Sequence, residues 1–312
     1  MLSYQTELCG FSVQWSPYDS KKLAVGTSQN FGIVGTGKQE ILRVQEREIH
    51  KICSFYTPNA IYDCCWSESN ERHLLSACGD GTIRLWDIGT SVNPRQTWAE
   101  HKAEVSSLSW NVLNKDWFVS VGWDGTIALW TPESMWPLHR WREQEICLYD
   151  CVWAPQHAHL TMTVGSDGKM KIWDVRNRQP SLVVDAHAFE ILCCDWNKYD
   201  QNIVATGSID KTIKIWDTRQ LKTPVNTLFA HNYAVRKLTW SPHYRSQFFS
   251  ASYDMTCILW DLSIDEPIVH RFEHHTEFCV GLSYNQFIEG KISSCGWDRH
   301  IFVWTLKPQS LY

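Results

Sequence analysis

The sequence lacks the features that mark membrane-spanning, secreted and metal-binding proteins. No apolar run approaches the ~20 residues that a membrane-crossing helix needs. The first ten residues, MLSYQTELCG, contain no basic segment followed by an apolar core. No Cys-x-x-Cys pair or Cys/His cluster has the spacing of a zinc site. We therefore expect no signal peptide, no direct membrane insertion, no metal and no cofactor.

An excess of positive charge is also missing. The 312 residues include 29 basic and 34 acidic side chains, which give a net charge of −5. Because nucleic acids and anionic membranes are bound through a dense basic surface, neither is expected as the main partner, whereas a basic peptide is compatible. The twelve cysteines are scattered, with adjacent pairs at Cys64–Cys65 and Cys193–Cys194 inside apolar stretches, which favours a reduced, intracellular protein over a disulfide framework.

The chain is rich in tryptophan, with 18 residues, because one motif recurs along it. Its clearest copy spans residues 207–217 and reads GSIDKTIKIWD, with an Asp in a polar turn and a Trp six residues later. The Asp residues of successive copies are 43 or 44 residues apart, at Asp80, Asp124, Asp167, Asp210, Asp254 and Asp298. A period of this length is typical of the four-stranded blades of a β-propeller.

Each repeat is predicted to contain four short strands, because apolar residues alternate with polar ones between turns rich in Asp, Gly, Asn and Pro. Residues 9–15 begin an irregular first blade and six regular blades follow, so the sequence predicts an all-β, seven-bladed propeller that forms a single domain over residues 1–312. The last repeat lacks a fourth strand. We expect residues 2–7 to pair with residues 301–306 and close the ring, which removes exposed sheet edges.

The repeat resembles the WD-repeat family over the whole chain. In that family a His, a Ser or Thr, an Asp and a Trp of one blade form a hydrogen-bonded tetrad, and such a satisfied buried network stiffens the blade. The resemblance implies four tetrads: His101, Ser120, Asp124 and Trp130; His187, Thr206, Asp210 and Trp216; His231, Ser250, Asp254 and Trp260; His275, Ser294, Asp298 and Trp304. Two other blades carry Thr57 and Gln144 at the His position, and weaker tetrads are expected there.

Two sequence patterns resemble functional motifs, one catalytic and one phosphate-binding. A Ser/His/Asp set is a hydrolase signature, but here it recurs in four blades and no G-x-S-x-G turn accompanies it. Residues 32–38, GIVGTGK, approach a phosphate-binding loop, but Gln39 stands where Ser or Thr should bind magnesium, and a strand is expected to follow instead of a helix. We therefore expect no enzymatic activity.

The resemblance to the WD-repeat family implies that the loops between blades and the Asp-bearing turns lie on one face, and partner binding is expected there. Two series of positions line this face: the residue six before the aromatic residue that ends the first strand of a blade, and the residue just before the Asp. Together with one neighbouring residue they supply Glu104, Glu190, Glu277, Trp123, Tyr253 and Trp297. Aromatic side chains bordered by charge are typical of binding hot spots, and this combination suits an amphipathic helix with basic residues along one edge.

Four segments resemble a narrower family, the receptors for the type-2 peroxisomal targeting signal, which are WD-repeat peroxins. They are residues 23–38, 187–199, 234–256 and 274–281, which read LAVGTSQNFGIVGTGK, HAFEILCCDWNKY, AVRKLTWSPHYRSQFFSASYDMT and HHTEFCVG. The resemblance implies a cytosolic receptor that binds the N-terminal helical signal of cargo proteins. It also implies a co-receptor peroxin, delivery to the peroxisomal docking complex for import into the matrix, and shuttling between cytoplasm and peroxisome.

For that function, Glu104 and Glu190 are predicted to meet the basic residues of the signal, and Trp123, Tyr253 and Trp297 to supply apolar contact. Further candidates near the same rim are Tyr62, Asp63, Tyr149, Asp150, Arg236 and Glu277. Exposed ion pairs contribute only ~0–1 kcal/mol each, so apolar burial should provide most of the affinity. Ordering a helix costs on the order of 1–2 kcal/mol per residue, which favours a second protein that covers the bound signal.

Two other functions remain open at this point. The segments that end in Arg176 and Arg219 read WDVR and WDTR, and they resemble the WDxR box of propellers that act as substrate adaptors of cullin-type ubiquitin ligases. The competing interpretation is that each Arg is solvated or pairs locally. A generic assembly scaffold is the other alternative, and its binding would be indifferent to changes at Glu104 and Glu190.

Overall fold

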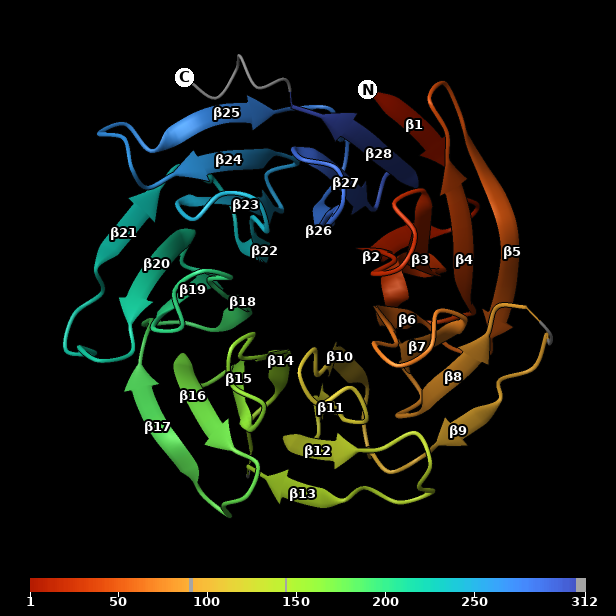
Figure 1. Cartoon of the computed structure of the whole chain (residues 1–312), viewed down its shortest axis with the longest axis horizontal. Coiled ribbons are helices and arrows are strands. Elements are labelled where there is room, and N and C mark those ends of the chain that lie inside the picture. The colour runs from red at the N-terminus through yellow and green to blue at the C-terminus, as the bar shows by residue number, and fades with distance from the viewer. Residues whose placement is uncertain (90–91, 144, 307–312) are drawn as a thin grey trace.

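Short antiparallel strands form a ring of seven four-stranded sheets in the computed structural model, which describes residues 1–89, 92–143 and 145–306 (Figure 1). In each of the first six blades, four consecutive strands run from the central axis to the outer edge. These blades contain β2 (Cys9–Trp15), β3 (Lys22–Ser28), β4 (Gly37–Val44) and β5 (Ile49–Thr57); β6 (Ile61–Trp66), β7 (His73–Cys78), β8 (Ile83–Asp87) and β9 (Gln96–Trp98); β10 (Val105–Trp110), β11 (Phe118–Gly122), β12 (Thr126–Trp130) and β13 (His139–Arg142); β14 (Leu148–Trp153), β15 (Leu160–Gly165), β16 (Lys169–Asp174) and β17 (Pro180–Asp185); β18 (Ile191–Trp196), β19 (Ile203–Ser208), β20 (Thr212–Asp217) and β21 (Asn226–Phe229); β22 (Val235–Trp240), β23 (Gln247–Ser252), β24 (Cys257–Asp261) and β25 (Ile268–Phe272).

The seventh blade joins the two ends of the chain. It contains β26 (Cys279–Tyr284), β27 (Lys291–Gly296) and β28 (His300–Thr305), and its outer strand is β1 (Leu2–Gln5). Leu2 lies opposite Val303 and Gln5 opposite His300 in an antiparallel ladder. The predicted closure by the N-terminal strand is therefore confirmed, and the seven-bladed all-β architecture with it.

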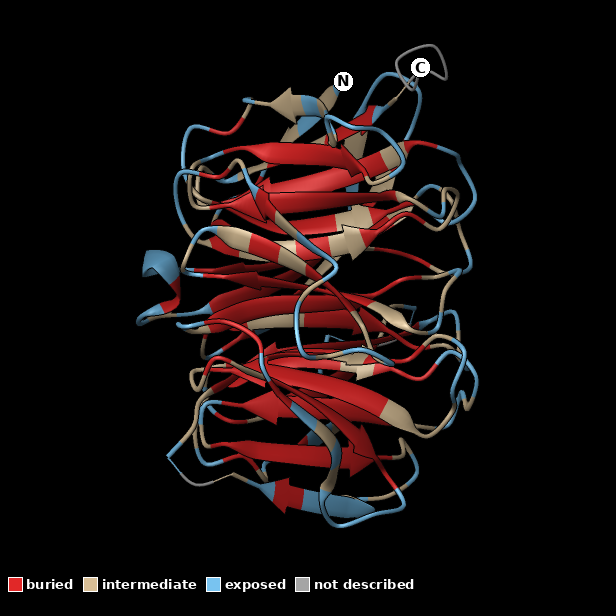
Figure 2. Cartoon of the chain, turned by 90° about the vertical axis from the view of Figure 1, so that its left-hand side faces the viewer, coloured by how far each residue is buried: buried red, intermediate tan, exposed pale blue. Residues whose placement is uncertain are grey.

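Burial follows the radial position of the strands. The inner and middle strands are largely buried between neighbouring blades, whereas outer strands such as β13 expose most of their side chains (Figure 2). The largest fully buried side chains are mainly the repeat tryptophans, including Trp66, Trp86, Trp130, Trp196, Trp240 and Trp260. The periodic tryptophans thus form the apolar contacts between blades, which explains their abundance.

Helical structure is confined to one turn in the described residues. This turn, η1 (Asn30–Gly32), lies between β3 and β4 in the segment that approaches a phosphate-binding loop. β4 begins at Gly37 and continues past Gln39, so the glycine-rich segment leads into a strand, as predicted. No helix in the described part of the chain is long and apolar enough to cross a membrane, and no cluster of metal-ligating side chains is found there.

Three of the four predicted tetrads are complete. In blade 5, Trp216 Nε1 donates to Thr206 Oγ1 over 3.0 Å, and the ring of His187 joins Thr206 to Asp210 with two contacts of 2.8 Å. Blades 3 and 6 contain the same chain of contacts, with Trp130, Ser120, His101 and Asp124 in one, and Trp260, Ser250, His231 and Asp254 in the other.

The tetrad predicted in blade 7 is wrong in one member. His275 contacts Ser294 at 2.7 Å and Asp298 at 2.8 Å, but Trp304 Nε1 is buried without a hydrogen-bond partner among the described residues. The neighbouring His274 takes this place, because its Nε2 lies 3.2 Å from Ser294 Oγ and its ring packs edge-on against Trp304. Adjacent histidines therefore compete for one hydroxyl, which the spacing of the repeat does not reveal.

The blades that lack a tetrad His use ion pairs near the same turn. In blade 2, Arg84 pairs with Asp80 at 2.6 Å, and Ser76 donates to Gln39 of blade 1 while accepting from Trp86. In blade 4, Lys171 bridges Asp167 and Glu143. Gln144, which the sequence places at the His position of this blade, lies outside the described residues.

The placement of His274 predicts that acid destabilises the fold. Burial and the neighbouring His275 lower the pKa of His274 to about 4 from an ordinary value of 6.5. Because the unfolded chain then binds more protons between these two values, stability is expected to fall as the pH falls below 6.5. The side chain is only partly buried and is therefore screened by solvent, so we expect a loss of only about 1–2 kcal/mol between pH 7 and pH 5.

Urea unfolding of the parent and of His274→Gln at both pH values measures this effect. The glutamine does not titrate and retains a polar contact for Ser294, so the variant should lose much less stability on acidification than the parent. The same decrease in both proteins would show that other groups cause the acid sensitivity.

Candidate functional site

Backbone hydrogen bonds bring the two predicted series of rim positions together. In blades 2 to 7, the residue just before the Asp donates its N–H to the carbonyl of a residue of the other series. That residue stands six positions before the aromatic residue that ends the inner strand. The N···O distances are 2.8–3.1 Å. The donors and acceptors are Gly79 and Ala60, Trp123 and Glu104, Ser166 and Cys147, Ile209 and Glu190, Tyr253 and Ala234, and Trp297 and Phe278. The two series therefore lie side by side around one face of the ring, and they place every strongly predicted candidate there.

The acidic part of this face extends over blades 3, 4 and 5. Glu104 and Glu190 precede β10 and β18, and Cys147 occupies the equivalent position between them. The pKa of the Cys147 thiol is raised by burial and by the charges of Glu190 and Glu104. Both carboxylates therefore act on the same point of the rim. We name Glu104, Cys147 and Glu190 the acidic arc.

Glu190 is held in place by a tyrosine of the neighbouring blade. Tyr149 Oη donates to Glu190 Oε2 over 2.6 Å. Burial raises the pKa of Tyr149, and Glu190 raises it further, so the phenol remains a donor at neutral pH. This contact orients a carboxylate that is only partly buried.

Aromatic side chains line the rim on the other side. Trp297 lies 5.0 Å from Phe278 and 6.2 Å from Tyr253 between ring centroids, and 5.2 Å from Phe31 of blade 1. Phe11 then joins Trp297 to Tyr62, and Tyr62 joins Trp123. We name this contiguous set the aromatic arc: Phe11, Phe31, Tyr62, Trp123, Tyr253, Phe278 and Trp297.

The arcs meet at blade 3. The ring of Tyr62 is 5.4 Å from that of Trp123, and the pKa of Tyr62 rises to about 12 because of burial and the nearby Glu104. Trp123 is 37% exposed and Phe31 is 49% exposed, so apolar surface remains open to a ligand. A helix that crosses this face can contact carboxylates on one edge and aromatic rings on another.

The weaker candidates line a cavity of about 250 Å³ on the axis of the ring, together with Phe11, Ser12 and Lys237. They are Tyr62, Asp63, Tyr149, Asp150 and Arg236. Arg236 Nη1 lies 3.4 Å from the carbonyl of Leu192, and no ion pair to this guanidinium is found among the described residues. Glu277 is exposed beside Phe278 and likewise has no ion pair within the described part of the chain.

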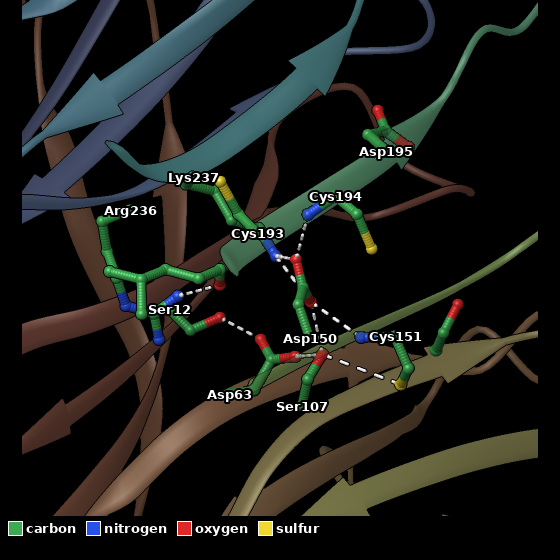
Figure 3. A network of polar contacts seen from close by, with 12 residues as sticks. Ser12, Asp63, Ser107, Asp150, Cys151, Cys193, Cys194, Asp195, Arg236 and Lys237 are labelled. Atoms are coloured by element: carbon green, nitrogen blue, oxygen red, sulfur yellow. Dashed lines mark hydrogen bonds and ion pairs between the residues drawn. The ribbon is translucent and has the colours of Figure 1, made fainter. Parts of the chain in front are cut away.

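The expected rim position of Asp150 is corrected, because its carboxylate is buried inside the axial cavity (Figure 3). It accepts from Ser107 Oγ at 2.8 Å and from the N–H groups of Cys151 and Cys194, each at 3.1 Å, and Lys237 Nζ lies 3.4 Å away. Burial opposes the charge of Lys237, but Asp150 and Asp63 raise the pKa of its ammonium group above the ordinary value.

Asp63 belongs to the same internal network. Its carboxylate accepts from Ser12 Oγ at 2.7 Å, from Ser107 Oγ at 3.2 Å and from the N–H of Leu108 at 3.0 Å. Ser12, Asp63, Ser107, Asp150 and Lys237 all stand three residues before the aromatic that ends an inner strand. The network therefore links the inner strands of blades around the axis, and this satisfies inner-strand N–H groups that no further strand pairs.

Sequence reasoning missed Phe11 and Phe31 in the aromatic arc and Lys237 in the network. Lys237 is in register with Asp63 and Asp150, so comparison of equivalent positions would have found it. Phe31 lies in η1, with a left-handed backbone at φ 56°, and the irregular first blade gives no repeat position to compare.

The arginines of the two WDxR segments pair locally. Arg176 binds Asp174 and Arg219 binds Asp217, in each case with an Nη2–Oδ2 distance of 2.6 Å. Each ion pair lies at the turn that follows its strand. This agrees with the interpretation that each Arg pairs locally.

Comparison with known proteins gives matches over most of the chain. The family described as WD domain, G-beta repeat matches residues 50–87, 92–131, 136–174, 178–217 and 222–261. The chain is 54% identical over 294 residues to the peroxisomal targeting signal 2 receptor of Dictyostelium discoideum, covering 93% of each chain. It is 50% identical over 299 residues to peroxisome biogenesis protein 7 of Arabidopsis thaliana, covering 95% of this chain and 94% of the relative. It is 45% identical over 296 residues to the peroxisomal targeting signal 2 receptor of Mus musculus, covering 95% and 93%.

Proposed function

This chain belongs to the WD-repeat family of peroxisomal targeting signal 2 receptors, and from that premise we propose that it binds the N-terminal helical signal of cargo proteins on the rim formed by the acidic and aromatic arcs. The observation that carries the proposal is the pairing of Glu104 with Trp123 and of Glu190 with Ile209 on one face. This arrangement offers negative charge and apolar surface to one amphipathic helix.

The two arcs have different roles in this proposal. Glu104 and Glu190 set the orientation of the signal, because partly exposed ion pairs add little free energy. Trp123, Tyr253 and Trp297 provide the apolar burial that supplies most of the affinity, at about 25 cal/mol per Å² of apolar surface removed from water. Glu277 and Arg236 contact the ends or flanks of the signal in this proposal.

A co-receptor peroxin completes the site in this proposal. A short helix is marginal in water, so binding must overcome the ordering of about ten residues. The rim covers one side of the helix, and a second protein that covers the other side adds apolar burial. The assembled receptor then acts in the cytosol, reaches the peroxisomal docking complex with its cargo and returns for another cycle.

The test is an anisotropy titration with a fluorescent type-2 signal peptide, with and without the co-receptor. We expect saturable binding that tightens by about tenfold or more when the co-receptor is present. A peptide whose basic residues are replaced by Glu should bind at least about tenfold more weakly. Tight binding that the co-receptor leaves unchanged would contradict its role, and the absence of binding in both conditions would contradict the receptor function.

A further inference from the structure

A second recessed surface lies at the outer edge of the ring, away from the axial cavity. It is a cleft of about 720 Å³ between the outer strand of blade 3, β13, and the turn that joins β16 to β17 in blade 4. In Figure 1 these two segments lie next to each other at the periphery. The side chains that line the cleft include Trp141, Trp173, Arg142, Lys171, Arg176 and Arg178.

Packing and hydrogen bonding between the two blades fix the shape of the cleft. Trp141 and Trp173 are 8% and 4% exposed, and their ring centroids are 6.2 Å apart. Trp141 Nε1 donates over 2.9 Å to the carbonyl of Asn177, which ties the turn of blade 4 to β13. An equivalent hydrogen bond joins blades 2 and 3, where Trp98 Nε1 donates to the carbonyl of Ser134. The floor of the cleft is therefore fixed by two packed indoles.

Most cations around the cleft are already neutralised. Lys171 contacts both Glu143 and Asp167, and Arg176 is held by Asp174. Arg140 lies 3.5 Å from Glu100. Of the lysine and arginine side chains that line the cleft, this leaves Arg142 and Arg178.

Arg142 and Arg178 are exposed and, within the described residues, neither side chain has a hydrogen bond or an ion pair. They line the same cleft from the two opposed segments. Two guanidinium groups without an ion pair among the described residues therefore share one cleft with the two indoles. Guanidinium groups bind carboxylates in a bidentate manner and so recognise them with defined geometry.

We propose that this cleft is a docking site for an acidic peptide segment of a partner protein. Carboxylates of the segment bind Arg142 and Arg178, and an aromatic or aliphatic side chain packs against the edges of Trp141 and Trp173. The proposed targeting signal is basic, so the same cleft repels it. The two surfaces therefore take ligands of opposite charge, and the second ligand can bind while cargo occupies the rim.

A peptide fits this surface better than an anionic membrane does. Membrane recognition through charge uses clusters of about four to eight basic residues on an accessible plane. Here two cations without an ion pair among the described residues line a recessed cleft between blades, and Glu143 and Asp174 neutralise the neighbouring Lys171 and Arg176.

The test uses a fluorescein-labelled acidic peptide with a central aromatic residue, EEDFDEE, in an anisotropy titration at low and physiological salt. We expect saturable binding that weakens with salt, and a decrease in affinity of at least about tenfold for Arg142→Glu/Arg178→Glu. The control is Arg47→Glu/Lys222→Glu, which reverses two exposed cations in the turns between the third and fourth strands of blades 1 and 5 and should change the affinity less than twofold.

The readouts separate this proposal from the proposed receptor function. Binding of the signal peptide should be the same for the parent and both double variants, and unchanged thermal unfolding shows that each variant is folded. Failure of the acidic peptide to bind, or equal losses in test and control variants, would overturn the docking site while leaving signal binding intact. Sedimentation with phosphatidylserine vesicles that depends on Arg142 and Arg178, without peptide binding, would also overturn it in favour of a lipid ligand.

Discussion

Reversing both rim carboxylates, Glu104→Lys with Glu190→Lys, is expected to weaken binding of a type-2 signal peptide by about 100-fold. Each substitution replaces an attraction of up to about 1 kcal/mol with a repulsion of similar size, and about 2.7 kcal/mol in total corresponds to this factor. Single variants should each lose about tenfold. Anisotropy titrations at constant ionic strength measure the change, because salt screens the contributions of exposed charges.

The control for this experiment reverses carboxylates outside the rim. Glu133 and Glu266 are exposed and lie in turns between the third and fourth strands of blades 3 and 6. Glu133→Lys/Glu266→Lys changes the net charge of the protein by the same amount as the rim variant. Signal affinity within about threefold of the parent is expected for this control. Equal losses in both double variants would mean that the overall charge, and not the acidic arc, attracts the signal.

The second large effect concerns stability, and it follows from the buried network on the axis. Asp150→Ala is expected to lower the free energy of unfolding by about 3–5 kcal/mol, because it leaves Lys237 without its closest carboxylate. The same substitution removes the closer of two acceptors for Ser107 Oγ and the acceptor for the N–H groups of Cys151 and Cys194. Equilibrium urea unfolding measures the loss.

Two further variants identify the cause of that destabilisation. Asp150→Asn keeps an oxygen acceptor but removes the negative charge, so it should lose less stability than Asp150→Ala. Asp265→Ala removes an exposed Asp in the turn after β24 and should change the unfolding free energy by less than about 0.5 kcal/mol. If Asp150→Ala were as stable as the parent, the network would not be what links the inner strands.

Positions that repeat in every blade were predictable from the sequence. A period of 43 or 44 residues places equivalent residues in equivalent surroundings, so one interpreted blade accounts for its neighbours. Together with the resemblance to the WD-repeat family, this reasoning predicted the closure of the ring, three complete tetrads and a common rim for Glu104 and Trp123. Their partners lie in the same blade or at a fixed offset from it.

Sequence reasoning failed where the partner of a residue comes from a different blade or from an irregular segment. Asp150 contacts Ser107, Cys194 and Lys237, which are 43, 44 and 87 residues away, so its burial depends on the whole ring. Trp304 loses its expected hydroxyl to His274, which no other blade has at that position. Phe31 reaches Trp297 only because blades 1 and 7 become neighbours when the ring closes.

The most direct test of the account is a charge exchange between receptor and signal. The Glu104→Lys/Glu190→Lys variant is titrated with a signal peptide whose basic residues are replaced by Glu. If these carboxylates face the basic edge of the bound helix, the exchanged pair should recover most of the affinity lost by either partner alone. Affinity as weak as that of the singly altered combinations would contradict this placement of the signal on the rim.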